Sequence, residues 1–332
     1  MQPMAPGCGC SAWCGVIRPW LRCAIQTTRR RRTSSSIAIP PAIKAQAWGS
    51  GIGEAATGGS LIRFDSATPG AVTTLGAISG AIARLDGLDF RPADGLLYGY
   101  EANGSGIYRV NINTGATTLV STSSVPVGNG RLGIDFNPVV DRLRVVNSAD
   151  DNRRINVATG AATADGALVY AVGDVNAGSN PQILDAAYLN ADVNVATGTQ
   201  LYYIDTGLDA LITTSAPNAG TLTTVGALGV NANGFLGFDI ATDALGFNIA
   251  YASLRVGVVD GLYTIDLGNG SATFVGDIAA SQLFGLAAAP ATPAAQAVAI
   301  PEPGSLALVA AAGLAVWGLR RRGARVSGDV CA

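Results

Sequence analysis

A short motif recurs along this chain and constrains its fold more than any other feature. Each full copy joins apolar residues to an aspartate, as in Gly87-Leu88-Asp89-Phe90, Gly133-Ile134-Asp135-Phe136 and Gly237-Phe238-Asp239-Ile240. A degenerate copy occupies Leu184–Tyr188, and a copy without aspartate occupies Phe284–Ala287. The unit returns about every 45 to 52 residues, the spacing of repeats that bury their apolar faces against one another. The body of the chain is therefore predicted to be a repeat domain.

Each motif is followed by alternating polar and apolar residues and by glycine-containing turns. The alternation Ile107-Tyr108-Arg109-Val110-Asn111 has the period of a half-buried strand. Thr114-Gly115, Thr159-Gly160 and Asn269-Gly270 are hairpin signals, because glycine accepts positive φ. One unit is read as four strands, at 87–90, 96–100, 107–111 and 117–121, which is the pattern of a propeller blade.

The first and last repeats are complementary halves. The first copy lacks the strand that carries the motif, whereas Leu283–Ala287 supplies such a strand with nothing after it. Joining the two halves closes a ring, so we predict an all-β, propeller-like body of about five four-stranded blades. A solenoid stack or a β-sandwich is the rival architecture, but neither explains the half-units.

Composition excludes several function classes. Hydrophobic residues make up 48% and charged residues 13%, which leaves ample apolar surface for a core. Histidine is absent, and the five cysteines lie outside residues 48–290, which excludes a usual zinc site, a Ser-His-Asp triad and a Cys-His dyad from the body. Between residues 48 and 300 stand 10 arginines and 21 acidic residues, so nucleic acid is not expected as a partner.

The C-terminal region carries three ordered features. Pro301, Glu302 and Pro303 follow an Ala/Pro-rich linker at 291–300, and an apolar segment at 305–319 precedes Arg320, Arg321 and Arg322. Trp317 and the arginines suit the end of a membrane helix. The arrangement resembles the PEP-CTERM sorting signal of Gram-negative bacteria. The resemblance implies a sorting signal at 301–325 with a transmembrane helix at 305–319, and a tail at 326–332. It also implies cleavage by an exosortase after transient inner-membrane anchoring.

Residues 1–47 are predicted to be a poorly structured leader. Arg29–Arg32 and Ala45-Gln46-Ala47 match the basic region and the cleavage site of a signal peptide. The segment between them is broken by Pro40-Pro41, so a misassigned start is the alternative reading.

The body itself resembles a family of bacterial secreted proteins known as domain of unknown function number 4394. The segments LIRFDSATPGAVTTLGAI, GIDFNPVVDRLRVVNSADDNRRINVATG and YYIDTGLDAL carry the resemblance. The family implies export and a repeat fold, and it supplies no biochemical activity.

The densest polar segment, 141–156, supplies the candidate ligand site. An anion or a uronic-acid sugar would be held by Arg142, Arg144, Asn152, Arg154 and Asn156. Arginine binds carboxylates bidentately, so the alternative is a cross-strand network with Asp141, Asp150 and Asp151. This structural alternative is favoured.

The repeated aspartates Asp89, Asp135 and Asp239 are expected to accept backbone N–H groups and to fix turns rather than to form a reactive ring. No cofactor is expected. Calcium is a weak candidate at Asp150-Asp151-Asn152 and Asn190-Ala191-Asp192, which lack the full spacing of a calcium loop.

Together these features predict an exported, exosortase-processed surface or matrix protein without catalytic activity, associated with exopolysaccharide or biofilm. The alternatives are a glycan- or anion-binding propeller module and a propeller enzyme acting on acidic glycans or lactones. The enzyme alternative is disfavoured because the body holds no histidine and only two glutamates, Glu54 and Glu101.

Overall fold

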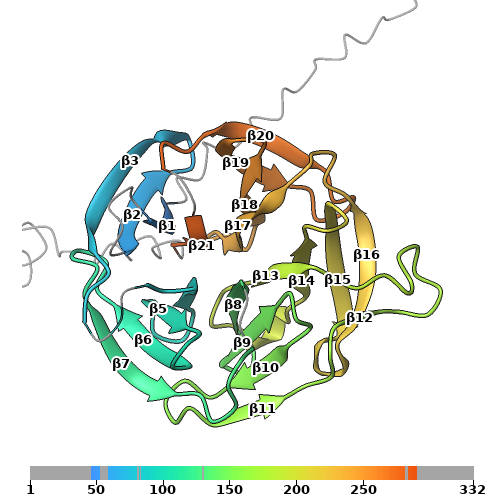
Figure 1. Ribbon diagram of the computed structural model, residues 1–332, viewed down its shortest axis with the longest axis horizontal. Helices are drawn as coiled ribbons and strands as arrows, with labels where there is room; N and C mark the ends of the chain where they lie inside the picture. Colours follow the sequence, from blue (N-terminus) through green and yellow to red (C-terminus); the bar gives the residue numbers. More distant parts are fainter. Residues whose placement is uncertain are drawn as a thin grey trace, which may run out of the picture. The chain divides into compact units, whose positions relative to one another are not determined.

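The computed structural model describes residues 46–52, 59–80, 82, 84–128, 131–280 and 283–289. These residues form five sheets arranged around a common centre (Figure 1). The all-β class and the propeller-like arrangement predicted from the repeats are thereby confirmed. Two short 3-10 helices, η1 (Val195–Thr197) and η2 (Pro217–Ala219), lie in loops.

The strands of each sheet run in order from the centre outward. The closing sheet holds β21 (Leu283–Ala288), β1 (Gln46–Ile52), β2 (Gly59–Asp65) and β3 (Thr68–Ala77). The second sheet holds β4 (Gly87–Arg91), β5 (Leu96–Glu101), β6 (Gly106–Val110) and β7 (Thr117–Thr122). The third sheet holds β8 (Leu132–Asn137), β9 (Arg142–Asn147), β10 (Asn152–Ile155) and β11 (Ala162–Ala164). The fourth sheet holds β13 (Ile183–Tyr188), β14 (Leu201–Asp205), β15 (Ala210–Ala216), β16 (Thr221–Ala227) and β12 (Val169–Tyr170). The fifth sheet holds β17 (Asn233–Thr242), β18 (Asn248–Val256), β19 (Val259–Ile265) and β20 (Ala272–Asp277).

Both ends of the domain contribute to the closing sheet. β21 pairs antiparallel with β1, with Ala47 opposite Ala288 and Gly51 opposite Leu283. The predicted joining of the two half-repeats is therefore confirmed. β1 begins at Gln46, inside the segment predicted as leader.

One sheet departs from the predicted pattern of four strands. β12 adds a fifth strand at its outer edge, where Val169 and Tyr170 pair in parallel with Thr221 and Leu222. The prediction of four strands in every blade is wrong here because the segment after β11 turns back along the neighbouring sheet, as the hydrogen bond from Gly166 N to Asn218 O shows.

The turns that follow β6, β10 and β19 share one design, in which a glycine N–H donates to the carbonyl four residues earlier. In the turn after β6, Asn111 O accepts from Gly115 N at 2.9 Å and Asn111 Oδ1 accepts from Asn113 N at 2.9 Å. Gly115 has φ 73°, which a residue with a side chain adopts only at a cost. The glycine predicted at this turn therefore occupies a position whose positive φ favours a residue without a side chain.

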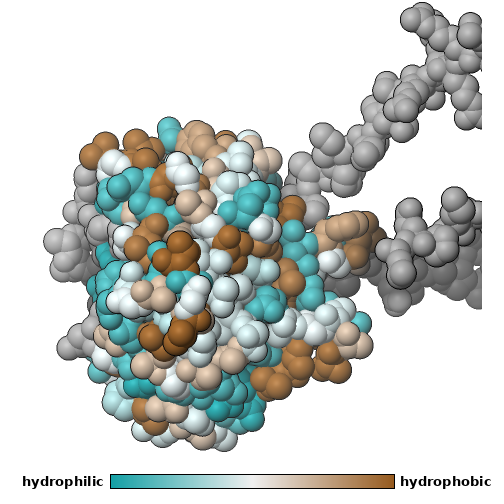
Figure 2. Space-filling model, turned by 90° about the vertical axis from the view of Figure 1, so that its right-hand side faces the viewer, coloured by the Kyte–Doolittle hydropathy of each residue, from teal (hydrophilic) through white to brown (hydrophobic). Residues whose placement is uncertain are grey.

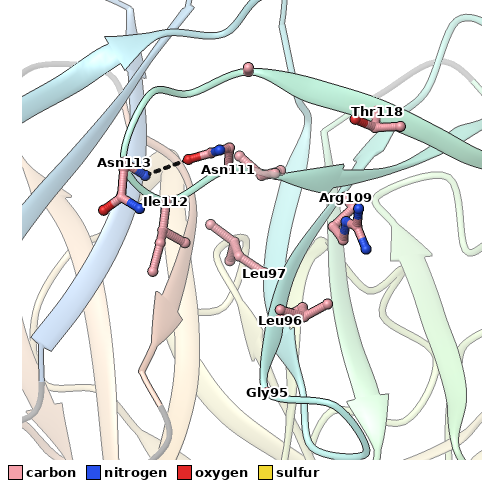
Figure 3. A pocket seen from close by; sticks show the side chains of 10 residues that line it. Gly95, Leu96, Leu97, Arg109, Asn111, Ile112, Asn113 and Thr118 are labelled. Atoms are coloured by element: carbon pink, nitrogen blue, oxygen red, sulfur yellow. Dashed lines mark hydrogen bonds between the residues drawn. The ribbon is translucent and has the colours of Figure 1, made fainter.

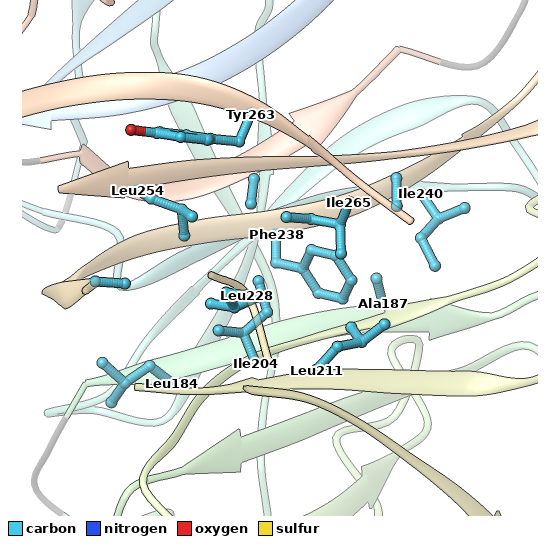
Figure 4. Packing of buried hydrophobic residues seen from close by; sticks show 13 residues of the cluster. Leu184, Ala187, Ile204, Leu211, Leu228, Phe238, Ile240, Leu254, Tyr263 and Ile265 are labelled. Carbon is cyan, nitrogen blue, oxygen red and sulfur yellow. The ribbon is translucent and has the colours of Figure 1, made fainter. Parts of the chain in front are cut away.

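The core lies between consecutive sheets. The buried residues described here gather into five clusters, and each lies mainly where one sheet meets the next. Figure 4 shows the cluster between β13–β16 and β17–β20, where Phe238 packs with Ile204, Leu228 and Ile240. Each repeat thus buries its apolar face against its neighbours, as the repeat pattern predicts.

On the side of β12 and β16, hydrophobic residues occur in several separate groups among hydrophilic ones (Figure 2). Scattered exposure of this kind is normal for a protein surface and does not mark an interface.

In the part of the chain that the structure describes, no helix is long and apolar enough to cross a membrane. The predicted helix at 305–319, the sorting motif Pro301–Pro303, and the anchor residues Trp317 and Arg320–Arg322 lie outside the described residues.

Candidate carboxylate centre and polar clusters

Three buried aspartates meet at the centre of the sheets. Asp89 on β4, Asp135 on β8 and Asp239 on β17 each offer a carboxylate oxygen, and these oxygens lie within 4.8 Å of one another. The three residues are 6%, 4% and 5% exposed. Each is the aspartate of the recurring motif, and each lies on the innermost strand of its sheet.

These aspartates join neighbouring sheets through backbone N–H groups. Asp89 Oδ2 accepts from Phe136 N on β8 at 2.7 Å, and Asp239 Oδ2 accepts from Ala288 N on β21 at 2.5 Å. Asp135 likewise accepts from the backbone of Tyr188 on β13. The predicted acceptor role is therefore found, but the donor belongs to the next sheet and not to a local turn.

The degenerate motif copy supplies a fourth link. Asp185 on β13 accepts from Phe238 N on β17 through Oδ2 at 2.8 Å, and its other oxygen accepts from Ala186 N at 2.9 Å. In the motif copy on β21, Ala287 stands where the other copies have aspartate. Successive links therefore run from β4 through β8, β13 and β17 to β21.

Burial dominates the electrostatics of this centre. The pKa of Asp89 is raised well above its ordinary value, mainly by burial and to a lesser extent by the neighbouring carboxylate of Asp239. Burial followed by the charges of Asp89 and Asp239 does the same to the pKa of Asp135. Burial raises the pKa of Asp239 to about 6, against the backbone N–H groups of Ala288 and Ile240 and a hydrogen bond from Asp135. Burial and mutual repulsion therefore favour the protonated form of these aspartates over the charged form.

Three hard oxygen donors at this spacing also have the chemistry that suits a cation such as Ca²⁺. However, both carboxylate oxygens of Asp239 already accept backbone N–H groups, from Ile240 at 2.6 Å and from Ala288. The observed contacts thus give the centre a linking role between sheets.

Three of the five predicted ligand-site residues meet around Asp165. Arg144 Nη1 lies 2.7 Å from Asp165 Oδ2, and Arg154 binds both oxygens of Asp165, at 2.7 and 2.9 Å. Asn152 Oδ1 accepts from Arg144 at 2.5 Å, and its amide donates to Gly166 O and Pro217 O. Arg144 is 2% exposed and also contacts Asn218 and Tyr188.

The other two residues of the predicted site lie apart. Arg142 donates to the backbone oxygens of Val140 and Asp141, and Asn156 Oδ1 accepts from Ala158 N in a hairpin turn. Asp165, which organises the cluster, was not among the predicted residues. Binding of a ligand by this segment stays a prediction.

In both weak calcium candidates an aspartate accepts a backbone N–H group, from a distant segment in one case and within a turn in the other. Asp151 Oδ2 accepts from Gly128 N at 2.7 Å, and Asp192 Oδ1 accepts from Asn194 N at 2.8 Å. Asp141, predicted as a local partner of the arginines, instead pairs with Arg91 of the neighbouring sheet.

A surface cavity of about 340 Å³ lies where β5 begins and β6 ends. Figure 3 shows Leu96, Leu97 and Ile112 lining it beside Arg109 on β6. None of the predicted site residues lines this cavity.

The sequence patterns did not predict that two arginines, Arg84 and Arg131, lie against the ring of Phe284. Arg84 Cζ lies 5.0 Å and Arg131 Cζ 4.7 Å from the centre of the Phe284 ring. The residues come from segments remote from one another in the chain, so no local motif announces the cluster.

The fold and its linked inner strands define a β-propeller-like protein. The chain belongs to the family described as "Domain of unknown function (DUF4394)", whose model matches residues 60–287. A second model, the PEP-CTERM protein-sorting motif, matches residues 299–322. Both resemblances drawn from the sequence are thus confirmed, and the motif indicates an exported chain that is processed by an exosortase and sorted to the cell surface.

The search among curated proteins found no match. Among solved structures, a nidogen/laminin complex matches with 14% identity and a TM-score of 0.41 over 74% of this chain and 98% of that chain. A putative 6-phosphogluconolactonase from Bacteroides uniformis matches with 15% identity and a TM-score of 0.38 over 71% and 83%. A protein of unknown function from Bacteroides thetaiotaomicron matches with 14% identity and a TM-score of 0.44 over 76% and 68%. At these TM-scores the matches support no inference about this chain.

Proposed function

We propose that this chain is an exported, exosortase-processed protein of the cell surface or extracellular matrix that acts by binding and not by catalysis. Its apolar segment at 305–319, followed by Arg320–Arg322, anchors it transiently in the inner membrane until cleavage near Pro301–Pro303 releases the propeller. Exopolysaccharide outside the cell is its proposed partner.

One observation carries the proposal: the sorting motif follows a domain that is already closed. β21 ends at Ala288, and the match to the sorting motif begins at residue 299. β21 is also the strand that pairs with β1. Cleavage at the motif would therefore remove nothing that the described sheets use, which suits a domain that functions after release.

The residue chemistry supports binding over catalysis. The chain contains no histidine, and its acidic centre is buried and engaged with backbone N–H groups. An enzyme acting on acidic glycans or lactones would instead need an accessible acid–base pair or a metal with open positions.

The test is the fate of the protein when the motif is altered. A triple variant, Pro301→Ala, Glu302→Gln and Pro303→Ala, is compared with the wild type by fractionating native cells. The control carries Pro290→Ala and Pro293→Ala in the adjoining linker. We expect the wild type and the control in the exterior polysaccharide fraction and the triple variant in the membrane fraction. Equal release of all three proteins would contradict processing at this motif.

A further inference from the structure

The cavity where β5 begins and β6 ends is lined by a single charge. Its volume of about 340 Å³ is at the lower end of the range that holds small ligands. All the residues that line it belong to the stretch 84–128, which the structure describes without a gap. Arg109 is the one charged residue among them. The lining is therefore positive, although the body of the chain is acidic.

Arg109 shares one face of the second sheet with Leu96 and Thr118. It lies directly opposite Thr118 on β7 and Tyr98 on β5, and residues directly opposite each other project from the same face. Leu96 precedes Tyr98 by two residues, so the alternation of a strand places it on that face as well. Figure 3 shows Arg109 on the same side of the cavity as Thr118.

The guanidinium of Arg109 keeps its N–H donors available. Among the residues that the structure describes, none forms a hydrogen bond or an ion pair with this group. Asp94, which precedes the lining residue Gly95, is engaged elsewhere, because it accepts from Arg91 Nη1 and from the hydroxyl of Tyr98 at 2.9 Å each. Arg109 is also exposed, so a solute in the cavity can reach its donors.

Aliphatic side chains form much of the remaining lining. Leu96 is 40% exposed and Ile112 is half-buried, whereas Leu97 and Val110 are buried. Exposed aliphatic surface can pack against the C–H groups of a sugar ring, because this contact removes apolar area from water. The hydroxyl of Thr118 can donate to and accept from sugar hydroxyls. The lining therefore suits a ligand with one anionic group on an otherwise uncharged ring.

We propose that this cavity binds a uronic-acid sugar, with the carboxylate of the sugar on Arg109 and its ring against Leu96. A guanidinium binds a carboxylate through two parallel N–H donors. One guanidinium matches the single charge of a uronate, whereas the acidic body would repel a polyphosphate chain. This inference rests on the proposed function, because it names the site and the chemical class through which the protein would hold exopolysaccharide.

The test is calorimetric titration of the purified full-length protein with methyl β-D-glucuronide. Methyl β-D-glucoside, in which a hydroxymethyl group replaces the carboxylate, isolates the contribution of the carboxylate, and acetate isolates that of the ring.

Three variants alter the cavity and one serves as the control. Arg109→Gln removes the guanidinium, Arg109→Lys keeps the charge without the paired donors, and Thr118→Phe fills the cavity without a change of charge. Arg84→Gln is the matched control, because the Arg84 side chain is 47% exposed and does not line the cavity. Thermal unfolding of each variant checks that it folds.

We expect the glucuronide to bind, and the glucoside and acetate to bind about tenfold more weakly or worse, because each lacks one half of the contacts. Arg109→Gln should weaken glucuronide binding by about tenfold, the effect of losing a charged hydrogen-bond partner. Thr118→Phe should have a similar effect and Arg109→Lys a smaller one. The affinity of Arg84→Gln should stay within about twofold of the wild type.

Absence of glucuronide binding by the folded wild type, or wild-type affinity in Arg109→Gln, would overturn the proposal. Equal affinities for acetate and the glucuronide would also overturn it, because the ring would then make no contact in the cavity. Because titration does not depend on where the protein is found in the cell, failed binding and failed sorting are distinguishable.

Discussion

The Oδ2 atom of Asp239 on β17 accepts a hydrogen bond at 2.5 Å from the backbone N–H of Ala288 on β21. β21 is the strand that returns to pair with β1. This one bond therefore connects the last sheet built from consecutive strands to the sheet shared by both ends of the domain. Asp89 and Asp185 make the same kind of link to Phe136 and Phe238.

Removing this link should destabilise the closed domain. In Asp239→Ala, the buried N–H of Ala288 loses its acceptor, which costs about 1–3 kcal/mol in the free energy of unfolding. Urea denaturation at pH 5 measures the loss, since most of the repulsion among the carboxyls is then neutralised. Asp277→Ala, at an exposed position on β20, is the control and should change stability by less than about 0.5 kcal/mol. Equal stability of the two variants would contradict the linking role.

The buried aspartates should make the protein less stable as the pH rises. Their folded-state pKa values lie above the ordinary value of 3.8, at about 6 for Asp239. Such a group contributes stability that is fully present below about pH 4 and is lost as the pH rises through its folded pKa. The contribution of Asp239 should therefore disappear between about pH 4 and pH 6. The raised pKa values of Asp89, Asp135 and Asp185 act in the same direction.

Thermal unfolding between pH 4 and pH 8 measures this dependence. The unfolding temperature of the wild type should fall across the range, and Asp239→Asn should show a flatter profile because it lacks the titrating group. A wild-type unfolding temperature that rises steadily to neutral pH would contradict the assigned pKa directions.

Replacing Asp165, which directly follows β11, should strongly lower the free energy of unfolding. Its side chain is 4% exposed and pairs with both Arg144 and Arg154. Asp165→Ala leaves the buried guanidinium of Arg144 without its carboxylate, which costs about 3–5 kcal/mol. The control is Asp141→Asn, which keeps a residue type that tolerates the φ of 50° and removes the charge of a pair with Arg91 in which Asp141 is 40% exposed; it should cost about 1 kcal/mol or less. Chemical denaturation that ranks the two variants the other way round would refute this account of the cluster.

Gly160 should not tolerate a side chain. Its φ is 71°, and an added Cβ would lie 1.9 Å from Thr122 O on the outer strand of the preceding sheet. Gly173 has φ 90° with nothing within 4 Å of an added Cβ, so Gly173→Ala isolates the backbone strain of about 1–2 kcal/mol. Gly160→Ala should be clearly less stable than Gly173→Ala in denaturant titrations. Similar midpoints for the two would mean that the turn does not pack against its neighbour as described.

Local sequence patterns predicted the strands well. The strands expected at 87–90, 96–100, 107–111 and 117–121 are β4 to β7, each within one residue at either end. The alternation of polar and apolar residues and the turn glycines are local signals, so they can be read directly. The half-repeats likewise predicted the pairing of β21 with β1. β12 escaped prediction because two residues are too few to show a period.

The polar sites depended on contacts that the local sequence does not show. The motif aspartates were expected to accept N–H groups, but the donor to Asp89 lies 47 residues away on another sheet. Asp165 lies 21 residues from Arg144 and follows the three-residue strand β11, so nothing marked it as the partner. The contacts of Arg84 and Arg131 with the ring of Phe284 join segments that lie far apart in the chain.

The central claim is that the closed propeller is exported and released at its C-terminal motif. The most direct test is the intact mass of the protein recovered from the outside of its native cells. The account predicts a species that begins near Trp48 and ends near Pro303, lacking the apolar segment at 305–319. A full-length mass, found only inside the cell, would contradict it.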